Sequence, residues 1–265
     1  MAIDFSKLRK LNEGKTKIIY LHPTDAKTVY MRFKDDITAG DGIKHDTIQG
    51  KAQLDWQTNR DIFEYLNRHG VKTHYISSPE DKVAMVRKLD HKINLEVVTR
   101  RVATGSILQW GHAVEGTRYE PLITQFHYKD DFLHDPLLDE KYVNYIITKK
   151  QGGEVYQKMI SLNSDVFIHI ERAFAHFSIQ LVDMKLEYGM IDNDVFLIDE
   201  ITGGSFRLWP YAKEKPNLNQ ENVLNELNAK GRLDKDTYRM GESLDHVISK
   251  FAVIAGITEK FSQLS

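Results

Sequence analysis

Three charged residues alternate with apolar residues in the stretch LVDMKLEYG, residues 181–189. Successive side chains of a β-strand point to opposite faces, so Asp183, Lys185 and Glu187 would share one face of a strand whose other face is apolar. An acid, a base and a second acid in one row can bind a metal ion and a phosphate group together. The alternative is a solvated outer face, on which ion pairs contribute little to stability.

A turn and a second strand would bring another carboxylate to this row. MIDND, residues 190–194, is a turn signal, and VFLIDEI, residues 195–201, is predicted to be a strand. If the turn has an odd number of residues, Glu187 lies directly across from Asp199, with roughly 5 Å between the Cβ atoms. Two carboxylates at that distance repel unless a cation lies between them, and Mg²⁺ takes one or two carboxylates plus phosphate oxygens. The spacing therefore predicts a magnesium site, with Lys185 able to reach a phosphate.

The stretch EVVTRRVATGSIL, residues 96–108, has the composition of an anion-binding site. A predicted strand delivers Arg100 and Arg101, and a Gly-Ser turn then opens a helix. Free N–H groups at a helix start bind anions, and the forked guanidinium of arginine suits phosphate. Ser106 could hold a ligand or cap the helix. The alternative is a capped helix with exposed arginines.

A third basic stretch, NEGKTKIIY, covers residues 12–20 and places Gly14 before Lys15 and Lys17. A glycine turn that leads into a strand can fold over nucleotide phosphates, as the glycine-rich loop of kinases does. The P-loop pattern GxxxxGK[ST] is absent. Further along, the stretch SFRLW would place Arg207 near the predicted metal site.

Composition excludes several classes of function. The 265 residues carry a net charge of −2, which gives no basic excess for general nucleic-acid binding. No apolar run approaches the roughly 18 residues of a membrane helix, and we expect no signal peptide in MAIDFSKLRK. Because the chain has no cysteine, disulfides, iron–sulfur clusters, zinc–thiolate sites and cysteine nucleophiles are excluded, which fits a reducing cytoplasm.

The elements that must position these residues fall into two groups. Residues 1–90 predict strands at 15–21, 28–33 and 84–90, with a helix over 45–70 that Gly70 ends. In residues 91–265 the pattern predicts a strand at 93–102 and the hairpin of 181–201. It also predicts helices over 104–114, 153–179 and 242–258, and a polar surface insertion at 210–231. We therefore expect an α+β protein of two lobes, with a cleft between them.

The order of the motifs resembles that of the SAICAR synthetase family. The resemblance rests on EGKTKIIY, FKDDITAGDG, LEVVTRRVATGSIL, HDPLLDE, LVDMKLEYG, DEITGGSFRLW and DKDTYR, between about residues 11 and 255. Three positions depart from the family's pattern: Asn94 stands where proline is usual, Tyr188 where phenylalanine is usual, and Pro210 where an acidic residue is common. At none of these three positions does the motif of the family match a charged residue of this chain, so the resemblance implies that activity is kept.

The resemblance implies a two-lobed fold with a kinase-like ATP cleft between an antiparallel-sheet N-lobe and a helix-rich C-lobe. It also implies the activity of the family in purine biosynthesis, which joins carboxyaminoimidazole ribonucleotide to L-aspartate with release of ADP and phosphate. A carboxylate does not react with an amine at neutral pH, so phosphoryl transfer from ATP would first make an acyl phosphate. Such transfer needs positioning and charge neutralisation.

The resemblance also implies a role for each matched residue. Glu187 and Asp199 would hold Mg²⁺. The ATP phosphates would be met by Lys15, Lys17 and Lys185, and the nucleotide by Lys88. The ribonucleotide would be bound by Arg100, Ser106 and Arg207, the first two at its 5′-phosphate, while Asp41 would face the imidazole substrate or aspartate and Asp135 would order the loop at the site. Among these, Lys185, Arg207 and Asp41 are expected to act in catalysis.

The expected partners are these small molecules, with no nucleic acid and no membrane, and a homo-oligomer, a dimer, is favoured. Two other functions stay open at this point. One is a different phosphotransferase that acts on a hydroxyl group in a similar cleft, although the HRD and DFG motifs of protein kinases are absent. The other is a nucleotide-binding module without catalysis, which the presence of both predicted metal ligands argues against.

Overall fold

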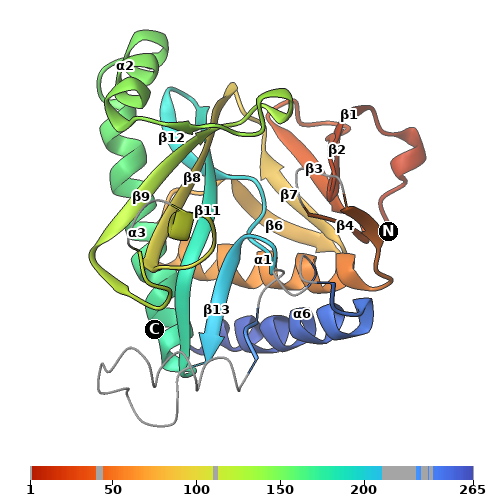
Figure 1. Ribbon diagram of the computed structural model, residues 1–265. Coiled ribbons are helices and arrows are strands. Elements are labelled where there is room, and N and C mark those ends of the chain that lie inside the picture. The colour runs from red at the N-terminus through yellow and green to blue at the C-terminus, as the bar shows by residue number, and fades with distance from the viewer. Residues whose placement is uncertain are drawn as a thin grey trace.

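The computed structural model describes residues 2–39, 44–109, 113–210, 231–233, 238 and 241–264. Asp41 and nearly all of the predicted insertion at 210–231 lie outside these residues. Figure 1 shows an α+β protein in which two antiparallel sheets lie above a pair of long helices, α1 and α6. None of the helices in the described part of the chain is both long and apolar enough to cross a membrane.

The first sheet is built entirely from the N-terminal third of the chain. Its five strands have the order β1-β2-β3-β7-β6. Their bounds are Lys10–Glu13 for β1, Lys17–Leu21 for β2, Thr28–Phe33 for β3, Tyr75–Glu80 for β6 and Val83–Arg87 for β7. The predicted antiparallel pair at 15–21 and 28–33 is confirmed as β2 and β3. A separate two-stranded hairpin follows the sheet, formed by β4 (Asp36–Ala39) and β5 (Lys44–Thr47).

The second sheet carries the stretch LVDMKLEYG, residues 181–189, in its strand β11. It has the strand order β10-β9-β8-β11-β12, and β13 also pairs with β11. The bounds are His91–Val102 for β8, Arg118–Tyr128 for β9, Leu137–Leu138 for β10, Ile179–Ile191 for β11, Asp194–Ile198 for β12 and Phe206–Pro210 for β13. Strand β11 is central because β8, β12 and β13 all pair with it. The predicted two faces of β11 are present: Val182, Met184, Leu186 and Tyr188 are fully buried.

Four α-helices and four short 3₁₀ helices complete the described residues. They are α1 (Lys51–Arg68), α2 (Glu140–Gln151), α3 (Val155–His176) and α6 (Leu244–Thr258), with η1 (Phe5–Lys7), η2 (Gly105–Gln109), η3 (Asp131–Leu133) and η4 (Glu259–Gln263). The predicted helix over 45–70 begins later, at Lys51, because the hairpin uses 44–47 and Gly50 turns the chain with a φ of 87°. The predicted helix over 104–114 is the 3₁₀ helix η2.

One main hydrophobic core joins the two sheets. It includes Met31 and Val86 from the first sheet, Val97 and Leu186 from the second, and the buried stripe of α3 around Ile170. The chain passes from the first sheet to the second between residues 87 and 91, next to the boundary expected at residue 90. The division into two lobes stays a prediction, since the sheets share this core.

A smaller core lies beside the main one. It consists of Ile37 and Ile48 around the β4–β5 hairpin, Tyr238, and Val247 and Phe251 of α6. The ring of Phe251 also packs against the backbone at Gly203, where a Cβ atom would lie only 2.8 Å from the ring. Helix α6 therefore supports both the hairpin and the loop that follows β12.

Candidate active site

A cleft of about 770 Å³ opens between the two sheets and the start of α1. Seven of the residues that the sequence singled out line it: Lys15, Lys17, Lys88, Asp135, Lys185, Glu187 and Asp199. They come from the start of β2 and the turn before it, the connection between β7 and β8, the loop after β9, strand β11 and the loop that follows β12. The fold thus brings together residues that lie up to 184 positions apart in the chain.

The β11–β12 hairpin has a register one residue away from the expected one. Ile191 pairs with Asp194, which leaves a two-residue turn, and Glu187 pairs with Ile198. The expectation of an odd-numbered turn with Glu187 opposite Asp199 was wrong. Asp192 and Asn193 both adopt left-handed φ values, 49° and 62°, as the tight hairpin turn that matches strand twist requires.

Asp199 nevertheless lines the same cleft as Glu187. A shift of one residue would normally turn a side chain to the other face of the sheet. Here β12 ends at Ile198, and Asp199 has a φ of 69°, so the backbone leaves the strand geometry at that residue. Aspartate and asparagine tolerate this left-handed conformation better than most residues.

Lys17 binds the two carboxylates that follow β12. Its Nζ lies 2.5 Å from Oδ1 of Asp199, and it also pairs with Glu200. Burial alone would lower the pKa of the Lys17 ammonium, but the two carboxylates outweigh burial and raise it. Burial would likewise raise the pKa of the Asp199 carboxyl, but Lys17, Lys92 and Lys129 together lower it. Both groups are therefore charged at neutral pH.

Glu187 lies between two lysines that the sequence analysis did not single out. Lys129 donates a hydrogen bond to its Oε1, and Lys92 forms an ion pair with its Oε2. Lys129 also lies 3.7 Å from Glu96, and Lys185 lies 2.7 Å from the same carboxylate. Burial would lower the pKa of Lys129, but the carboxylates of Glu187, Asp199 and Glu96 raise it. Alternation along β8 could have placed Glu96 on the face of Arg100, whereas the approach of Lys129 depends on how β9 pairs with β8.

His74 is a further cleft residue that the sequence did not indicate. Its ring is buried, and burial lowers its pKa to about 4, so the imidazole is neutral at pH 7. Nε2 donates to the backbone carbonyl of Asp199 over 3.0 Å. This contact fixes the turn of the chain that aims Asp199 into the cleft.

Arg100, Ser106 and Arg207 form a second cluster around Asp183. Arg100 and Arg207 donate to the same carboxylate oxygen, Oδ2, over 2.7 Å and 2.6 Å, and Arg100 also donates to Oγ of Ser106 over 3.1 Å. Gly105 has a φ of 68°, and any Cβ there would lie 2.7 Å from the Arg207 guanidinium. The three residues expected to bind one ribonucleotide therefore lie together, and the buried Asp183, which had no assigned role, orients two of them.

Asp135 orders its own loop. Its Oδ1 accepts a hydrogen bond from the backbone of Asp130 over 2.9 Å, and the Asp130 side chain in turn accepts from the backbone of Phe132 and Leu133. The loop returns beside Lys129, so its shape determines where that lysine reaches the cleft.

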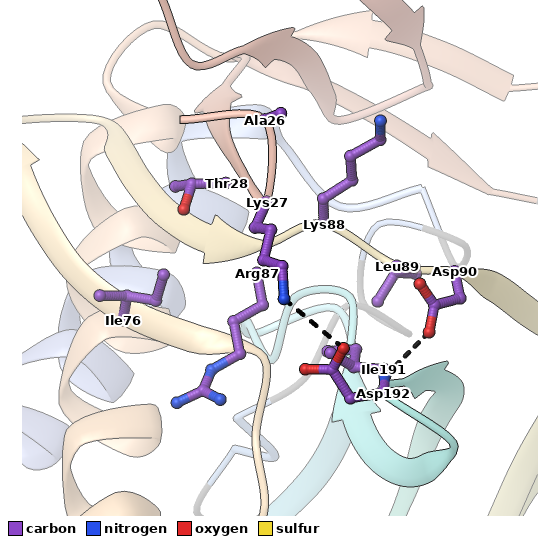
Figure 2. A pocket seen from close by; sticks show the side chains of 10 residues that line it. All are labelled: Ala26, Lys27, Thr28, Ile76, Arg87, Lys88, Leu89, Asp90, Ile191 and Asp192. Atoms are coloured by element: carbon purple, nitrogen blue, oxygen red, sulfur yellow. Dashed lines mark hydrogen bonds and ion pairs between the residues drawn. The ribbon is translucent and has the colours of Figure 1, made fainter. Parts of the chain in front are cut away.

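Lys88 also lines a second pocket, of about 590 Å³, at the crossing between the sheets (Figure 2). Lys27 and Asp192 lie 3.8 Å apart across it, and the backbone of Asp192 donates to Asp90 over 2.8 Å. Figure 2 shows the side chains of Arg87 and Lys88 pointing in different directions. The cations do not converge there, so the larger cleft is the stronger candidate for the active site.

The carboxylates of the cleft could supply only some of the ligands that a Mg²⁺ ion needs. Within the described residues, no group of three or more histidine, cysteine, aspartate or glutamate side chains could hold a metal. Mg²⁺ is usually held by one or two carboxylates together with substrate phosphates and water. Glu187 and Asp199 both line the cleft, and Lys92 and Lys129, which pair with Glu187, also lower the pKa of Asp199, so these two carboxylates are the candidates for such a pair.

Comparison with known proteins gives one consistent result. The family model described as SAICAR synthetase matches residues 10–251. A phosphoribosylaminoimidazole-succinocarboxamide synthase of Herpetosiphon aurantiacus is 38% identical over 95% of this chain and 98% of its own length. The synthase of Sulfolobus acidocaldarius is 37% identical over 90% of this chain and 93% of its own.

Two solved structures agree in fold. The synthase from Ehrlichia chaffeensis superimposes with a TM-score of 0.80 and 31% identity, over 95% of this chain and 98% of that one. A SAICAR synthetase in complex with ADP gives a TM-score of 0.78 and 31% identity, over 93% and 96%. The α+β fold of the SAICAR synthetase type, expected from the sequence, is therefore confirmed.

Proposed function

The chain belongs to the SAICAR synthetase family and joins carboxyaminoimidazole ribonucleotide to L-aspartate at the expense of ATP, and we propose that the cleft between the two sheets is where this reaction occurs. The observation that carries the proposal is the meeting of Glu187, Asp199 and Lys17 in one cleft. Opposite charges from both sheets surround a space that could hold a triphosphate, in a cleft of the kind that kinases use.

We propose that the reaction proceeds in two steps. A carboxylate oxygen of the ribonucleotide attacks the γ-phosphorus, and the bond to the β-phosphate oxygen breaks to release ADP. The amine of aspartate then attacks the acyl carbon, loses a proton and displaces phosphate. Lys15, Lys17 and Lys185 would meet the phosphates, and Lys88 the rest of the nucleotide. The buried face of β11 fixes the backbone from which Lys185 reaches the cleft, which favours positioned phosphoryl transfer.

We further propose that Mg²⁺ binds at Glu187 and Asp199, where it would neutralise charge on the transferred phosphoryl group. Asp41, which lies outside the described residues, would face the imidazole substrate or aspartate, and Asp135 would order the loop beside them. The expectations of a cytoplasmic location and of a dimer belong to the same proposal. Light scattering during size-exclusion chromatography would measure the oligomeric state.

The reaction can be tested directly by phosphate release. With ATP, Mg²⁺ and the carboxylated ribonucleotide, sustained phosphate release should require L-aspartate, because the amine is needed to discharge the acyl phosphate. Release at the same rate without aspartate would contradict the ligase assignment. Product analysis by mass should show the succinocarboxamide only in the complete mixture.

Arg207→Gln should raise the KM for the ribonucleotide by roughly 10- to 150-fold, since a charge-assisted hydrogen bond contributes about 1.5–3 kcal/mol. The KM for ATP should stay close to that of the parent protein. Arg207 suits the test better than Arg100, because Arg100 is more deeply buried against Asp183. Arg118→Gln is the matched control, an arginine of the same sheet outside the cluster. Equal rises in both KM values would show that Arg207 has a structural role.

A further inference from the structure

The carboxylate of Glu187 has both of its oxygens engaged by ammonium groups. Lys129 takes Oε1 and Lys92 takes Oε2, while the glutamate side chain is only 5% exposed. The two lysines reach it from different places, Lys92 from β8 and Lys129 from the residue after β9. A metal ion that binds Glu187 therefore competes with at least one ammonium group for a buried carboxylate oxygen.

The ion pairs around Asp199 and Glu187 form two groups of opposite net charge. Lys17, Asp199 and Glu200 make one group with a net charge of −1. The other contains Glu96 and Glu187 with Lys92, Lys129 and Lys185, and has a net charge of +1. The two groups together are neutral, so a divalent cation added alone would leave an excess of two positive charges in a partly buried space. A nucleotide triphosphate carries the negative charge that offsets this excess and gives the displaced lysines new partners.

We propose that Lys92 and Lys129 compete with the divalent metal for Glu187, so that the protein takes up the metal together with the nucleotide rather than before it. This inference rests on the proposed magnesium site. It assigns the two lysines a role in the order of binding: they occupy the buried carboxylate and exclude a free cation until phosphate groups arrive. The absence of a three-ligand protein cage among the described residues fits a metal that needs the nucleotide's oxygens.

The test measures metal binding rather than turnover. Mn²⁺, which prefers the same oxygen ligands, is titrated into the full chain and the free ion is counted by electron paramagnetic resonance. The parent protein should bind Mn²⁺ weakly alone and at least about tenfold more tightly with a non-hydrolysable ATP analogue. Lys92→Met and Lys129→Met should bind Mn²⁺ without nucleotide at least about tenfold more tightly than the parent, because each leaves one buried oxygen of Glu187 without its ammonium partner and open to the metal.

Lys72→Met is the matched control. Lys72 pairs with Asp194 at the far end of the same hairpin and does not line the cleft, so its loss should leave Mn²⁺ binding unchanged. Thermal melts in EDTA and in Mn²⁺ give a second measurement: the two cleft variants should melt lower than the parent in EDTA and recover with Mn²⁺.

Two outcomes would overturn the inference. In one, the parent binds Mn²⁺ without nucleotide as tightly as the two variants do. In the other, neither variant gains affinity although both remain folded. Failure of the proposed function is a different result, namely a parent protein whose phosphate release needs no divalent metal at all.

Discussion

Replacing Asp199 by asparagine should lower kcat by at least about a hundredfold, the scale of losing one preorganised charge at a reacting phosphoryl group. The substitution isolates charge from shape. Asn is nearly isosteric with Asp and also tolerates the left-handed φ of 69°. The fold should survive, because Lys17 keeps its pairing with Glu200.

The measurement combines kinetics at saturating substrates with a thermal melt. Asp192→Asn is the control, since Asp192 is also an aspartate of the same hairpin with a positive φ, 49°, and it lies outside the cleft. It should leave kcat unchanged. If Asp199→Asn retained more than about a tenth of the parent kcat, the carboxylate would not be a metal ligand of the reaction.

Lys185→Met should also reduce kcat by at least about a hundredfold, with little loss of stability. Lys185 lies 2.7 Å from Glu96, but its side chain is 40% exposed, and an exposed ion pair contributes little to the free energy of unfolding. Methionine keeps most of the stem's packing and removes the charge. A charge that acts on the transferred phosphoryl group strengthens in the transition state, so its loss lowers kcat.

Lys158→Met provides the comparison for Lys185, because Lys158 is 47% exposed and pairs with carboxylates away from the cleft. Both variants should melt close to the parent, and only Lys185→Met should lose turnover. A Lys185→Met protein with parental kcat and a much lower melting temperature would make the charged face of β11 part of the scaffold alone.

Local patterns predicted the parts of the site that lie within single strands. Alternation along β11 separated the buried Tyr188 from the charged Lys185, and both side chains lie as expected. The stretch of residues 96–108 was interpreted as one anion-binding site that contains Arg100 and Ser106, and a hydrogen bond joins these two side chains. These predictions succeed because the geometry of a strand or turn is determined by neighbouring residues.

Relations between strands were harder to predict. The hairpin register depended on whether Asp192 and Asn193 would form a two-residue turn, and a difference of one residue changed the partner of Glu187. Lys129 reaches Glu187 across 58 residues because β8 pairs with both β9 and β11, an order of strands that no local pattern contains. The competition between lysine and metal for one carboxylate could therefore be recognised only in three dimensions.

The contact between Gly203 and Phe251 has a consequence for how the protein is made. The loop that carries Asp199 and Glu200 leaves the ribosome before α6, which supports it from below through the Phe251 ring. At a synthesis rate of roughly 5–20 residues per second, about 50 residues and several seconds separate the two segments. During that interval the strands of both sheets are already complete, but the carboxylates lack their support. The strands of a nascent chain can thus be in place before the last helix docks against the loop that carries Asp199 and Glu200.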